Sequence, residues 1–588
     1  MKINNIPNIN YLWGGLIVEE LVRNGATDFF IAPGSRSTPL SLSVARCKKA
    51  KKTIHFDERG LGFYALGASS AGKGPAVLIS TSGTAVANFL PSVIEASKKK
   101  VPLIILTADR PPELRKTGSL QTIDQTGIYG NYVRWDFDLP VPDEKIIPEM
   151  VLTTIDQAVF MSKNPLPGPV HINCMFREPL APRKNEGKWI SNISLNENWV
   201  KSNKPFTKYY CSEIKPEQKD IKSISKIINS SLNGIIVVGK LNGDDELESV
   251  INLAEKLKWA IFPDLSSGLR LNGISDNIIH YFDQILLSDL FINSKIDTVI
   301  HLGGRITSKR YYRFIEKIKP ANYITVLNHH LRNDPLHTVS HRIKSSVKTF
   351  IYSILPQLNL REDSKLLSRL KLASNLVNKE IDDFVRKGNL NEIFISREIS
   401  KNINRNNILF LSNSMPVRDM DMYAAVNEKK LYIGGNRGAS GIDGIIASAC
   451  GYSSSMEKPL TLLIGDLAFL HDINSLALLN KTKNKIIIVV VNNNGGSIFS
   501  FLPIAEYKTD FEKFFTTPHG MNFEYIAKQF GIKYLRVSSR VEFSKKYNFA
   551  GKYDGNVIME VKIDMDKNIN SHKNLQKSIK MKLDKKNR

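Results

Sequence analysis

Cysteine is scarce in this chain. Its 588 residues include four cysteines, which lie far apart and form no CxxC pair: Cys47, Cys174, Cys211 and Cys450. This spacing argues against a zinc site and against a disulfide framework, and it is typical of a protein in a reducing cytosol. We therefore expect a cytoplasmic protein.

Long apolar runs are also absent. No stretch approaches the ~20 apolar residues that a membrane span needs. The first residues, MKINNIPNINYLWGG, lack the basic head, apolar stretch and cleavage site of a secretory signal. We expect neither a membrane span nor a signal peptide. The hydrophobic fraction of 42% and the charged fraction of 23% are those of an ordinary globular protein.

Acidic residues are too few to balance the basic ones. The chain has 57 acidic and 81 basic residues, and its formal net charge is +24. That charge alone would suggest nucleic acid as a partner. Lysine is abundant all along the chain, however, and no RNA- or DNA-binding motif accompanies it. We expect no nucleic-acid partner, with a basic RNA-binding protein as a remote alternative. For the densest basic stretch, residues 571–588, we expect a solvated, partly disordered tail rather than a polyanion site.

The chain does contain a repeated alternation of helix and strand patterns. Residues 11–23 have helical apolar spacing, and we predict helices after Thr38 and at 85–98. Apolar strand runs are predicted at 28–32, 52–56, 76–80 and 103–107. This alternation with short loops predicts a parallel, doubly wound α/β sheet. Ligands bind beyond the carboxyl ends of such strands, where Ser35-Arg36, Glu58 and Asp109-Arg110 fall.

The length predicts three or four domains, at roughly 150 residues each. Predicted strands at 234–238 and 298–302 begin a second α/β unit, which has no GxGxxG and is therefore not expected to bind NAD. Strands at 408–411, 460–464 and 485–491 belong to a third. We predict three doubly wound parallel-sheet domains at 1–190, 205–360 and 385–575, and a basic tail at 576–588. A polar linker at 183–208 and a largely helical connector at 344–387 would join them.

A carboxylate and a carboxamide follow two successive strands of the third predicted domain. One strand ends in Gly465-Asp466-Leu467, and the next ends in Asn492-Asn493-Asn494-Gly495-Gly496. The single helical segment between them, at 473–481, would make these strands parallel neighbours. We therefore expect Asp466 and Asn493 to lie side by side.

These groups suit a magnesium ion that holds a diphosphate. Mg²⁺ takes about six hard oxygens, few of them from protein. Asp466, the side-chain oxygen of Asn493 and a main-chain carbonyl such as that of Gly495 would supply three. Two diphosphate oxygens and a water would supply the others, and the glycines let the backbone approach the phosphates. Two ordinary turns are the alternative. The arrangement matches the thiamine-diphosphate signature, and we predict thiamine diphosphate with Mg²⁺ or Mn²⁺.

Thiamine diphosphate also needs an activating carboxyl group. A carboxyl hydrogen-bonded to the aminopyrimidine promotes the tautomer whose nitrogen removes the thiazolium C2 proton. Glu58 in HFDERG, at a predicted buried strand end, fits this role and is our catalytic candidate. A surface charge cluster with Asp57 and Arg59 is the alternative. We interpret His55 as structural rather than as a proton shuttle, because it precedes Glu58 inside a strand.

The motifs together closely resemble the 2-succinyl-5-enolpyruvyl-6-hydroxy-3-cyclohexene-1-carboxylate (SEPHCHC) synthase family, MenD. They cover nearly the whole chain except the middle domain: APGSRSTPL at 32–40, HFDERGLGFYALG at 55–67, LTADRPPELR at 106–115, NSMPVRD at 413–419, GNRGASGIDG at 435–444, GDLAFLHDIN at 465–474 and VNNNGGSIFSFLP at 491–503.

The resemblance implies a thiamine-diphosphate-dependent transferase of menaquinone biosynthesis. Such an enzyme decarboxylates 2-oxoglutarate on the cofactor, adds the succinyl carbanion equivalent to isochorismate in a 1,4-addition, and releases CO₂. It also implies a pyrimidine-binding, a central Rossmann-like and a diphosphate-binding domain. In this superfamily the glutamate and the diphosphate grip of one centre come from different subunits, so we expect a homodimer or a homotetramer.

Both substrates are dianions, which arginine binds in a bidentate manner. By the resemblance, four residues would face isochorismate: Ser35, Arg36, Arg110 and Gln121. Ser414, Arg418 and Arg437 would serve the carboxylates of 2-oxoglutarate or its adduct. Lys309, or its neighbour Arg310, is a weaker candidate from the middle domain.

The resemblance also assigns apolar residues to the cofactor. Ile442 would prop it in its bent shape, although core packing is the alternative for that side chain. Ile498, Phe499 and Leu502 would form an apolar wall that keeps water from the carbanion.

Two rival functions stay open. Another carboligase or decarboxylase of the superfamily, such as acetohydroxyacid synthase, would lack GSRSTPL and the arginine set. A catalytically silent binding or scaffold subunit would be expected to have lost Glu58 or the metal pair, and both are intact here.

Overall fold

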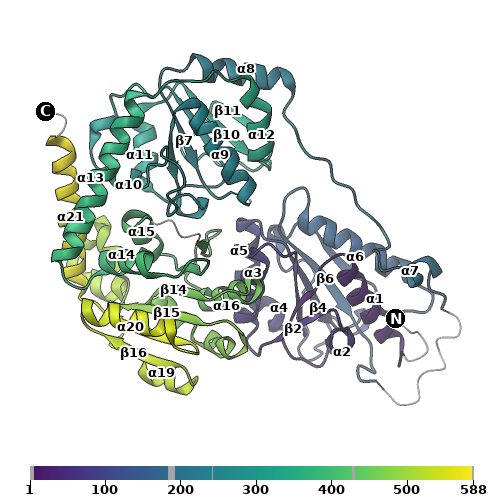
Figure 1. Cartoon of the computed structure of the whole chain (residues 1–588). Helices are drawn as coiled ribbons and strands as arrows, with labels where there is room; N and C mark the ends of the chain where they lie inside the picture. The colour runs from purple at the N-terminus through teal and green to yellow at the C-terminus, as the bar shows by residue number, and fades with distance from the viewer. Residues whose placement is uncertain (1–5, 183–192, 242, 427–430, 586–588) are drawn as a thin grey trace. The chain divides into compact units, whose positions relative to one another are not determined.

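The computed structural model describes residues 6–182, 193–241, 243–426 and 431–585. These residues form three parallel sheets flanked by helices (Figure 1). The chain divides into two compact units. The first comprises Met1–Cys211, Gly435–Pro459 and Ala468–Ile486 and contains one sheet; the second comprises Ser212–Gly434, Leu460–Leu467 and Ile487–Arg588 and contains two. The prediction of three parallel-sheet domains is confirmed.

The sheet of the first unit has the strand order β2-β1-β3-β4-β6-β5, with parallel pairing throughout. Its strands are β1 (Asp28–Ile31), β2 (Lys51–Ile54), β3 (Ala76–Ser80), β4 (Leu103–Asp109), β5 (Asp136–Leu139) and β6 (Pro169–Met175). Its helices are α1 (Ile9–Arg23), α2 (Thr38–Arg46), α3 (Glu58–Ser70), α4 (Thr84–Asn88), α5 (Leu90–Lys99) and α6 (Pro148–Lys163). The four predicted strands are present within two residues. The predicted helix at 85–98 is divided in two, because Pro91 has no backbone N–H to continue the helix.

Alternate strand residues of this sheet face opposite helical layers. Phe29, Val77 and Ile104 belong to one apolar core, together with Leu16 of α1 and Ile155 of α6. Helices α3 and α5 pack with each other and contact the sheet. The sheet is therefore buried on both faces, and every residue of β3, β4 and β6 is buried.

The second unit carries the other two sheets. One has the order β11-β10-β9-β7-β8 and the other β13-β12-β14-β15-β17-β16. The strands of the first are β7 (Gly234–Val238), β8 (Ala260–Pro263), β9 (Thr298–Leu302), β10 (Asn322–Leu327) and β11 (His341–Lys344). Those of the second are β12 (Ile408–Leu411), β13 (Tyr432–Gly434), β14 (Leu460–Gly465), β15 (Ile486–Asn492), β16 (Lys533–Val537) and β17 (Val557–Lys562).

The helices that follow the first sheet are α7 (Glu197–Lys201), α8 (Gln218–Ser230), α9 (Asp244–Leu257), α10 (Phe282–Ile285), α11 (Lys309–Ile318), α12 (Val347–Ile354), α13 (Lys365–Lys387), α14 (Glu392–Asn402), α15 (Met415–Tyr423), α16 (Ile445–Met456), α17 (Asp466–His471), α18 (Lys508–Phe511), α19 (Glu524–Gln529), α20 (Arg540–Lys552) and α21 (Met565–Lys585). Two of them, α12 and α13, confirm the predicted helical connector at 344–387. The segment predicted as helical at 473–481 is a 3₁₀ helix, η8 (Ile473–Lys481). None of the described helices is long and apolar enough to cross a membrane.

Two segments differ from their prediction. Part of the predicted linker, residues 183–192, lies outside the described residues. Within the rest, α7 anchors the chain through Trp199, which is buried and donates from Nε1 to Oε2 of Glu20 at 2.6 Å.

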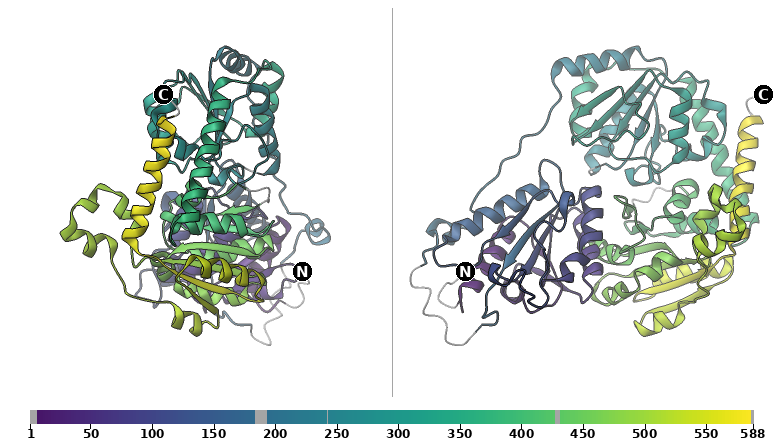
Figure 2. Two further views of the ribbon diagram at one scale, coloured as in Figure 1. Left: turned by 60° about the vertical axis from the view of Figure 1, so that its left-hand side comes forward. Right: turned by 180° about the vertical axis from the view of Figure 1, so that it is seen from behind.

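The prediction of a solvated tail is wrong for most of the C-terminal segment. Helix α21 lies beside α13, as Figures 1 and 2 both show, and buries Leu575, Ile579 and Leu583.

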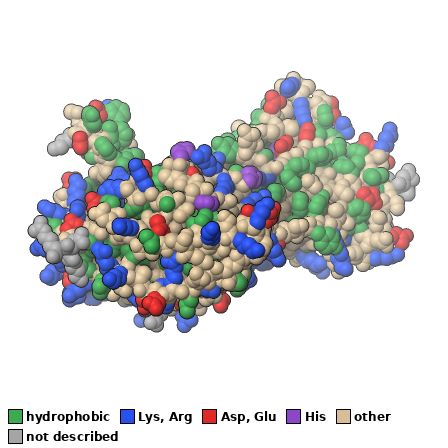
Figure 3. Space-filling model, turned by 90° about the horizontal axis from the view of Figure 1, so that it is seen from above, with side chains coloured by type: hydrophobic (Ala, Val, Ile, Leu, Met, Phe, Trp, Pro, Cys, Tyr) green, Lys and Arg blue, Asp and Glu red, His purple; other side chains and the backbone are tan. Residues whose placement is uncertain are grey.

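The surface charge is distributed rather than concentrated in one patch on the face that Figure 3 shows. Lysine and arginine side chains are scattered over this face and interspersed with acidic ones. This distribution favours a solvated surface over a basic groove of the kind that tracks a nucleic-acid backbone.

Glycines allow α3 and α16 to pack in direct backbone contact within the first unit. A Cβ on Gly67 would lie 2.0 Å from the carbonyl oxygen of Ser448, and one on Gly451 would lie 1.9 Å from that of Tyr64. The hydroxyl of Ser448 donates to the carbonyl of Phe63 at 3.1 Å. The sequence thus specifies this helix pair by omitting side chains at the crossing.

We expect Gly451→Ala to lower the free energy of unfolding by about 1–3 kcal/mol, the cost of overpacking a close contact. The matched control is Gly551→Ala in α20, where nothing lies within 4 Å of the added Cβ. That change should be neutral or stabilising by up to ~1 kcal/mol. Chemical denaturation of both variants measures the difference, and equal stability would contradict the close packing.

Candidate active site

The metal candidates lie at the carboxyl ends of two adjacent strands. β14 and β15 are neighbours in the third sheet, as predicted, and Asp466 and Asn493 follow them directly. Asp466 is 2% exposed and Asn493 is 7% exposed. Oδ2 of Asp466 accepts from the backbone N–H of Gly495 at 2.9 Å, which ties the two strand ends together.

The carboxamide of Asn493 has one free atom. Its Nδ2 donates to Oε1 of Glu392 at 3.0 Å and to Oγ of Ser497 at 2.8 Å. Both amide hydrogens are thereby used, whereas the buried Oδ1 has no partner among the described residues. A buried carbonyl oxygen without a partner costs free energy unless something binds it. Beside the Asp466 carboxylate, this oxygen fits a divalent cation of the Mg²⁺ or Mn²⁺ class.

The loop after β15 requires glycine at residue 495. Its φ is +139°, and a Cβ there would lie 2.1 Å from the carbonyl oxygen of Thr516. Oδ1 of Asn494 accepts from the backbone N–H groups of His519 and Gly520 and so fixes the same loop from outside. The backbone of Gly495 is thus held at the strand end, where its carbonyl was predicted to serve as a ligand.

His519 adds a contact that the sequence did not predict. Its Nε2 lies 3.2 Å from Oδ2 of Asp466. Burial raises the pKa of Asp466, while the contacts with His519 and with the backbone N–H groups of Gly495 and Leu467 oppose that rise. A lone histidine 53 residues from Asp466 carries no motif, so no sequence signal identified it.

Behind Asn493 lies a fully buried group, the cluster Glu392–Asp419–His572. Nε2 of His572 lies 2.9 Å from Oδ1 of Asp419, and its Nδ1 lies 2.9 Å from the carbonyl oxygen of Asn568. Burial, followed by the Asp419 charge, raises the pKa of Glu392 to about 8. Burial opposes the charged form of His572, but the Asp419 carboxylate outweighs it and raises the pKa of His572 to about 9. No sequence pattern suggested this cluster.

Glu58 opens a helix in the first unit instead of ending a strand. β2 ends at Ile54, and Glu58 is the first residue of α3, whose N-cap Asp57 accepts from the N–H of Gly60 at 3.2 Å. Glu58 is half-buried, and its Oε2 accepts from Nδ2 of Asn88 at 3.3 Å. The predicted buried strand end is therefore wrong in detail. The carboxyl instead occupies a helix N-terminus, which favours negative charge.

His55 lies just before this helix and is 1% exposed. Its ring packs on Phe56 with centroids 4.5 Å apart, and burial lowers its pKa. A neutral, packed imidazole is the state that this environment favours.

Arg36 and Arg110 form a cationic site in the first unit. Arg36 donates to the carbonyl of Phe176 at 3.0 Å, and Arg110 donates to Oγ of Ser82 and to the carbonyl of Gln121 at 2.8 Å. Burial, followed by the charge of Arg36, lowers the pKa of Arg110. Arg36 also lies 3.5 Å from Oε1 of Glu178, an exposed carboxylate that balances part of the charge. Two neighbouring guanidinium groups still favour a bound anion.

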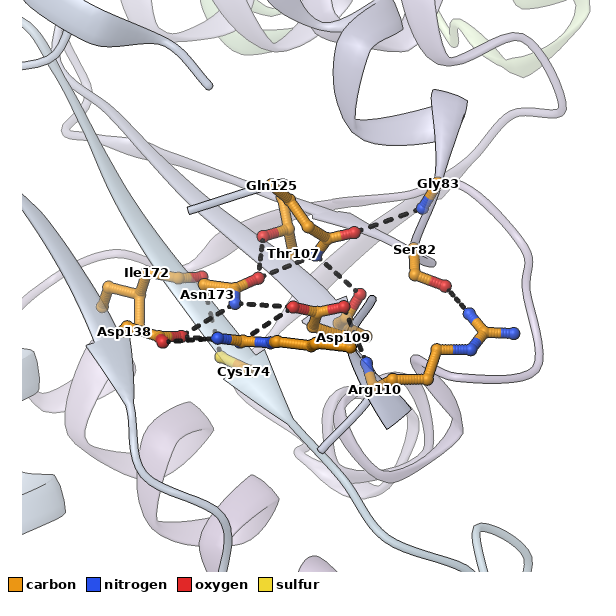
Figure 4. A network of polar contacts seen from close by, with 12 residues as sticks. Ser82, Gly83, Thr107, Asp109, Arg110, Gln125, Asp138, Ile172, Asn173 and Cys174 are labelled. Atoms are coloured by element: carbon orange, nitrogen blue, oxygen red, sulfur yellow. Dashed lines mark hydrogen bonds and ion pairs between the residues drawn. The ribbon is translucent and has the colours of Figure 1, made fainter. Parts of the chain in front are cut away.

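A buried polar network holds the backbone of Arg110 (Figure 4). Asn173 of β6 is at its centre. Its Nδ2 donates to Asp109 at 3.0 Å and to Asp138 at 2.8 Å, and its Oδ1 accepts from Gln125 at 2.7 Å and from Thr107 at 3.0 Å.

The ends of this network reach the arginine loop. Oδ1 of Asp109 accepts from the backbone N–H of Arg110 at 2.7 Å, and Oε1 of Gln125 accepts from the N–H of Gly83 at 3.2 Å. Arg115 bridges the two acids at 2.9 Å each. Burial opposes ionisation of Asp138, but its bonds with Arg115 and Asn173 lower its pKa. Apart from Asp109, the sequence did not single these residues out, because each is an ordinary polar residue far from the others.

Ser35 is exposed in the loop before α2, and the remaining two predicted residues of the first unit lie in the segment before α16. Arg437 is half-buried, and Ile442 is 39% exposed. The buried carboxylate of Glu95 accepts from the N–H groups of Gly438, Ala439 and Ser440 at 2.6–3.1 Å, so it fixes the loop between these two residues.

The predicted residues of the second unit lie at a helix start and around the loop after β15. Ser414 has φ +70° and accepts at its carbonyl oxygen from Arg418 of α15. Gly465, Leu467, Ile498 and Phe499 are half-buried, and Leu502 is 41% exposed. Lys309 is exposed at the start of α11. Arg310 is instead paired with Asp283 at 2.6 Å and bonded to Gln576 at 3.0 Å, which gives it a structural contact.

Three family models match this chain. Residues 13–128 match the "Thiamine pyrophosphate enzyme, N-terminal TPP binding domain", residues 188–411 the "Middle domain of thiamine pyrophosphate", and residues 418–561 the "Thiamine pyrophosphate enzyme, C-terminal TPP binding domain".

Curated relatives match over nearly their whole length. One from Rubrobacter xylanophilus is 40% identical and covers 97% of this chain and 98% of its own. One from Prosthecochloris aestuarii is 41% identical and covers 99% of each chain, and one from Salinibacter ruber is 38% identical and covers 98% of each. All three are named 2-succinyl-5-enolpyruvyl-6-hydroxy-3-cyclohexene-1-carboxylate synthase.

We expect Asn173→Ala to lower the free energy of unfolding by more than a surface substitution does. It leaves several buried polar partners unpaired, at about 1–3 kcal/mol for each group. Asn402→Ala, which removes one exposed bond to the carbonyl of Glu398, is the control and should stay within about ±0.5 kcal/mol. Denaturant titration measures both, and a neutral Asn173→Ala would contradict the network.

Proposed function

Because this chain belongs to the SEPHCHC synthase family of thiamine-diphosphate enzymes, we propose that it decarboxylates 2-oxoglutarate and adds the succinyl carbanion equivalent to isochorismate. The addition is a 1,4-addition, it belongs to menaquinone biosynthesis, and CO₂ is the other product. The observation that carries this proposal is the near full-length match to relatives of that name, with Glu58, Asp466, Asn493 and the arginine loops in place.

The cofactor would be held at the end of the third sheet. Asp466 and Asn493, with the carbonyl of Gly495, would bind Mg²⁺ or Mn²⁺, and Gly465 and Leu467 would border the diphosphate. The free Oδ1 of Asn493 supports this assignment. Bound thiamine diphosphate supplies a nucleophilic carbon that can stabilise a carbanion. Glu58 would exchange a proton with its aminopyrimidine ring.

The arginines would bind the substrate carboxylates. Ser35, Arg36, Arg110 and Gln121 would receive isochorismate, and the mutual opposition of Arg36 and Arg110 supports a dianion there. Ser414, Arg418 and Arg437 would bind 2-oxoglutarate, with Lys309 as a further cation. A fixed cationic surface strengthens binding of a dianion most where water is excluded.

Apolar side chains would exclude that water. Ile442 would support the cofactor, and Ile498, Phe499 and Leu502 would line its reactive side. The exposed fractions of Ile442 and Leu502, 39% and 41%, show apolar surface that a ligand can cover. Excluding water protects the carbanion from protonation.

We also propose the organisation of the working enzyme. The three domains would span residues 1–190, 205–360 and 385–575, and the enzyme would act in the cytoplasm as a homodimer or homotetramer. By the family resemblance, Glu58 and Asp466 of one centre would come from different chains.

The test of the proposed reaction is direct. With thiamine diphosphate, Mg²⁺ and 2-oxoglutarate, the protein should consume isochorismate and release CO₂. Glu58→Gln should lower kcat by at least ~10²-fold, because it removes the proton exchange. Preference for pyruvate over 2-oxoglutarate would point to a carboligase of the acetohydroxyacid synthase kind. Near wild-type activity of Glu58→Gln would refute the role of Glu58.

The proposed two-chain centre makes a separate prediction. Glu58→Gln and Asp466→Ala should each have little activity alone, and Asp466→Ala should raise the concentrations of metal and cofactor required. Dimers formed by mixing the two variants should recover about a quarter of wild-type activity, since random pairing in a two-fold dimer restores one centre in half of the dimers. No recovery in verified mixed dimers would contradict a centre shared between chains.

A further inference from the structure

The cluster Glu392–Asp419–His572 joins three helices of the second unit behind Asn493. Its members come from α14, α15 and α21, and their exposed fractions are 4%, 1% and 1%. None of them has a role in the proposed reaction. Burying three ionisable side chains costs free energy unless each is hydrogen-bonded, so their presence at this position requires an explanation.

The contact that leaves the cluster goes to the proposed metal ligand. Oε1 of Glu392 accepts from Nδ2 of Asn493 at 3.0 Å. A carboxamide has an oxygen end and a nitrogen end of nearly the same shape, and its partners decide which end points where. If the amide turned over, its oxygen would face Oε1 of Glu392, and a hydrogen could lie between them only if Glu392 gave up its hydrogen bond with Asp419. Glu392 therefore selects the orientation in which Oδ1 of Asn493 is free.

Glu392 is itself held in place from two sides. Its backbone N–H donates to Oδ1 of Asn568 at 3.0 Å, which anchors the first turn of α14 to α21. Asp419 lies against its carboxyl group, and Asp419 is in turn bonded to Nε2 of His572. The ring of His572 also packs edge-on against Phe501 and Tyr423, with centroids 5.3 and 5.5 Å away. Buried contacts thus fix both the backbone position of Glu392 and the orientation of its carboxyl group.

We propose that Glu392 is a positioning residue which, held by Asp419 and by His572 of α21, turns the Asn493 carboxamide so that Oδ1 faces the divalent ion. This inference rests on the proposed role of Asn493 as a metal ligand. Groups that hydrogen-bond to metal ligands typically change metal affinity by about 10–100-fold when they are removed. The C-terminal helix, although rich in lysine, then supports the proposed metal site through His572 and Asn568.

The same three side chains could instead hold a cation themselves, since one ligand atom from each lies within 4.8 Å of the others. Two contacts favour the positioning role. Oε1 of Glu392 is directed at Asn493, and Nε2 of His572 is directed at the Asp419 carboxylate. The experiment separates the two roles.

The test compares Mg²⁺ affinity in variants of the full-length protein. We expect Glu392→Leu to raise the Kd for Mg²⁺, measured by calorimetry at saturating thiamine diphosphate, by about 10–100-fold. Glu392→Gln should stay within about threefold of wild type, because its amide oxygen can still accept from Asn493 while its nitrogen donates to Asp419. His572→Phe keeps the ring packing but loses both hydrogen bonds, so it should weaken Mg²⁺ binding in the same direction as Glu392→Leu.

Matched controls separate positioning from general destabilisation. Ser578→Ala removes a polar contact of α21 with Glu380, remote from the cluster, and should leave the Kd unchanged. Asn493→Ala should weaken Mg²⁺ binding at least as much as Glu392→Leu. The melting temperature of each variant is measured without metal. A purely structural role of Glu392 would appear there in full, as a lower melting temperature of Glu392→Leu.

Four results would overturn the inference. Weak Mg²⁺ binding in Asn493→Ala but a wild-type Kd in Glu392→Leu would refute the positioning role and leave the proposed function intact. A wild-type Kd in Asn493→Ala would refute the metal assignment on which both depend. Stoichiometric zinc in the purified wild-type protein, lost in His572→Phe, would make the cluster a metal site of its own. If Glu392→Leu does not fold, a Kd for His572→Phe equal to that of wild type would likewise refute the inference.

Discussion

The orientation of one buried carboxamide in the second unit depends on the hydrogen bonds that its nitrogen makes. Asn493 lies at the end of β15 with both amide hydrogens bonded and its oxygen free. The free oxygen has a defined direction only because the nitrogen end is fixed. That fixation reaches through Glu392 to α14, α15 and α21, so helices from two distant parts of the sequence determine the orientation of one atom at the sheet edge.

The first unit uses buried polar groups in the same manner, but to hold a cation. All donors and acceptors of the Asn173 side chain are hydrogen-bonded. One of its partners, Asp109, accepts a further bond from the backbone N–H of Arg110. The guanidinium of Arg110 therefore stays beside Arg36, although burial and, after it, the charge of Arg36 lower its pKa. Two like charges held together at a cost in free energy would make the proposed binding of a dianion there more favourable.

The sequence predicted what local pattern determines. The apolar runs located about half of the described strands, and the strand–helix–strand spacing made β14 and β15 neighbours. It failed where an ordinary residue acquires its role only from the fold. Asn173, His519 and Glu392 have no motif, and the starting point of α3 at Glu58 depends on the capping by Asp57. The order of α21 was missed for a different reason. Its buried residues, Ile569, His572, Leu575, Ile579 and Leu583, recur at helical spacing, but its lysines suggested a solvated tail.

The buried side of α21 explains why so basic a segment is ordered. Its lysines face solvent, while its apolar residues pack in the core that contains Val377 and Ile381 of α13. Apolar packing of this kind tolerates many substitutions of similar volume. The hydrogen bonds of His572 do not, because each has one geometry and one partner. Residue 572 should therefore be constrained by its two hydrogen bonds, and its apolar neighbours on the helix only by volume. The position through which a helix supports the proposed metal site can in this way differ from the positions that hold the helix in place.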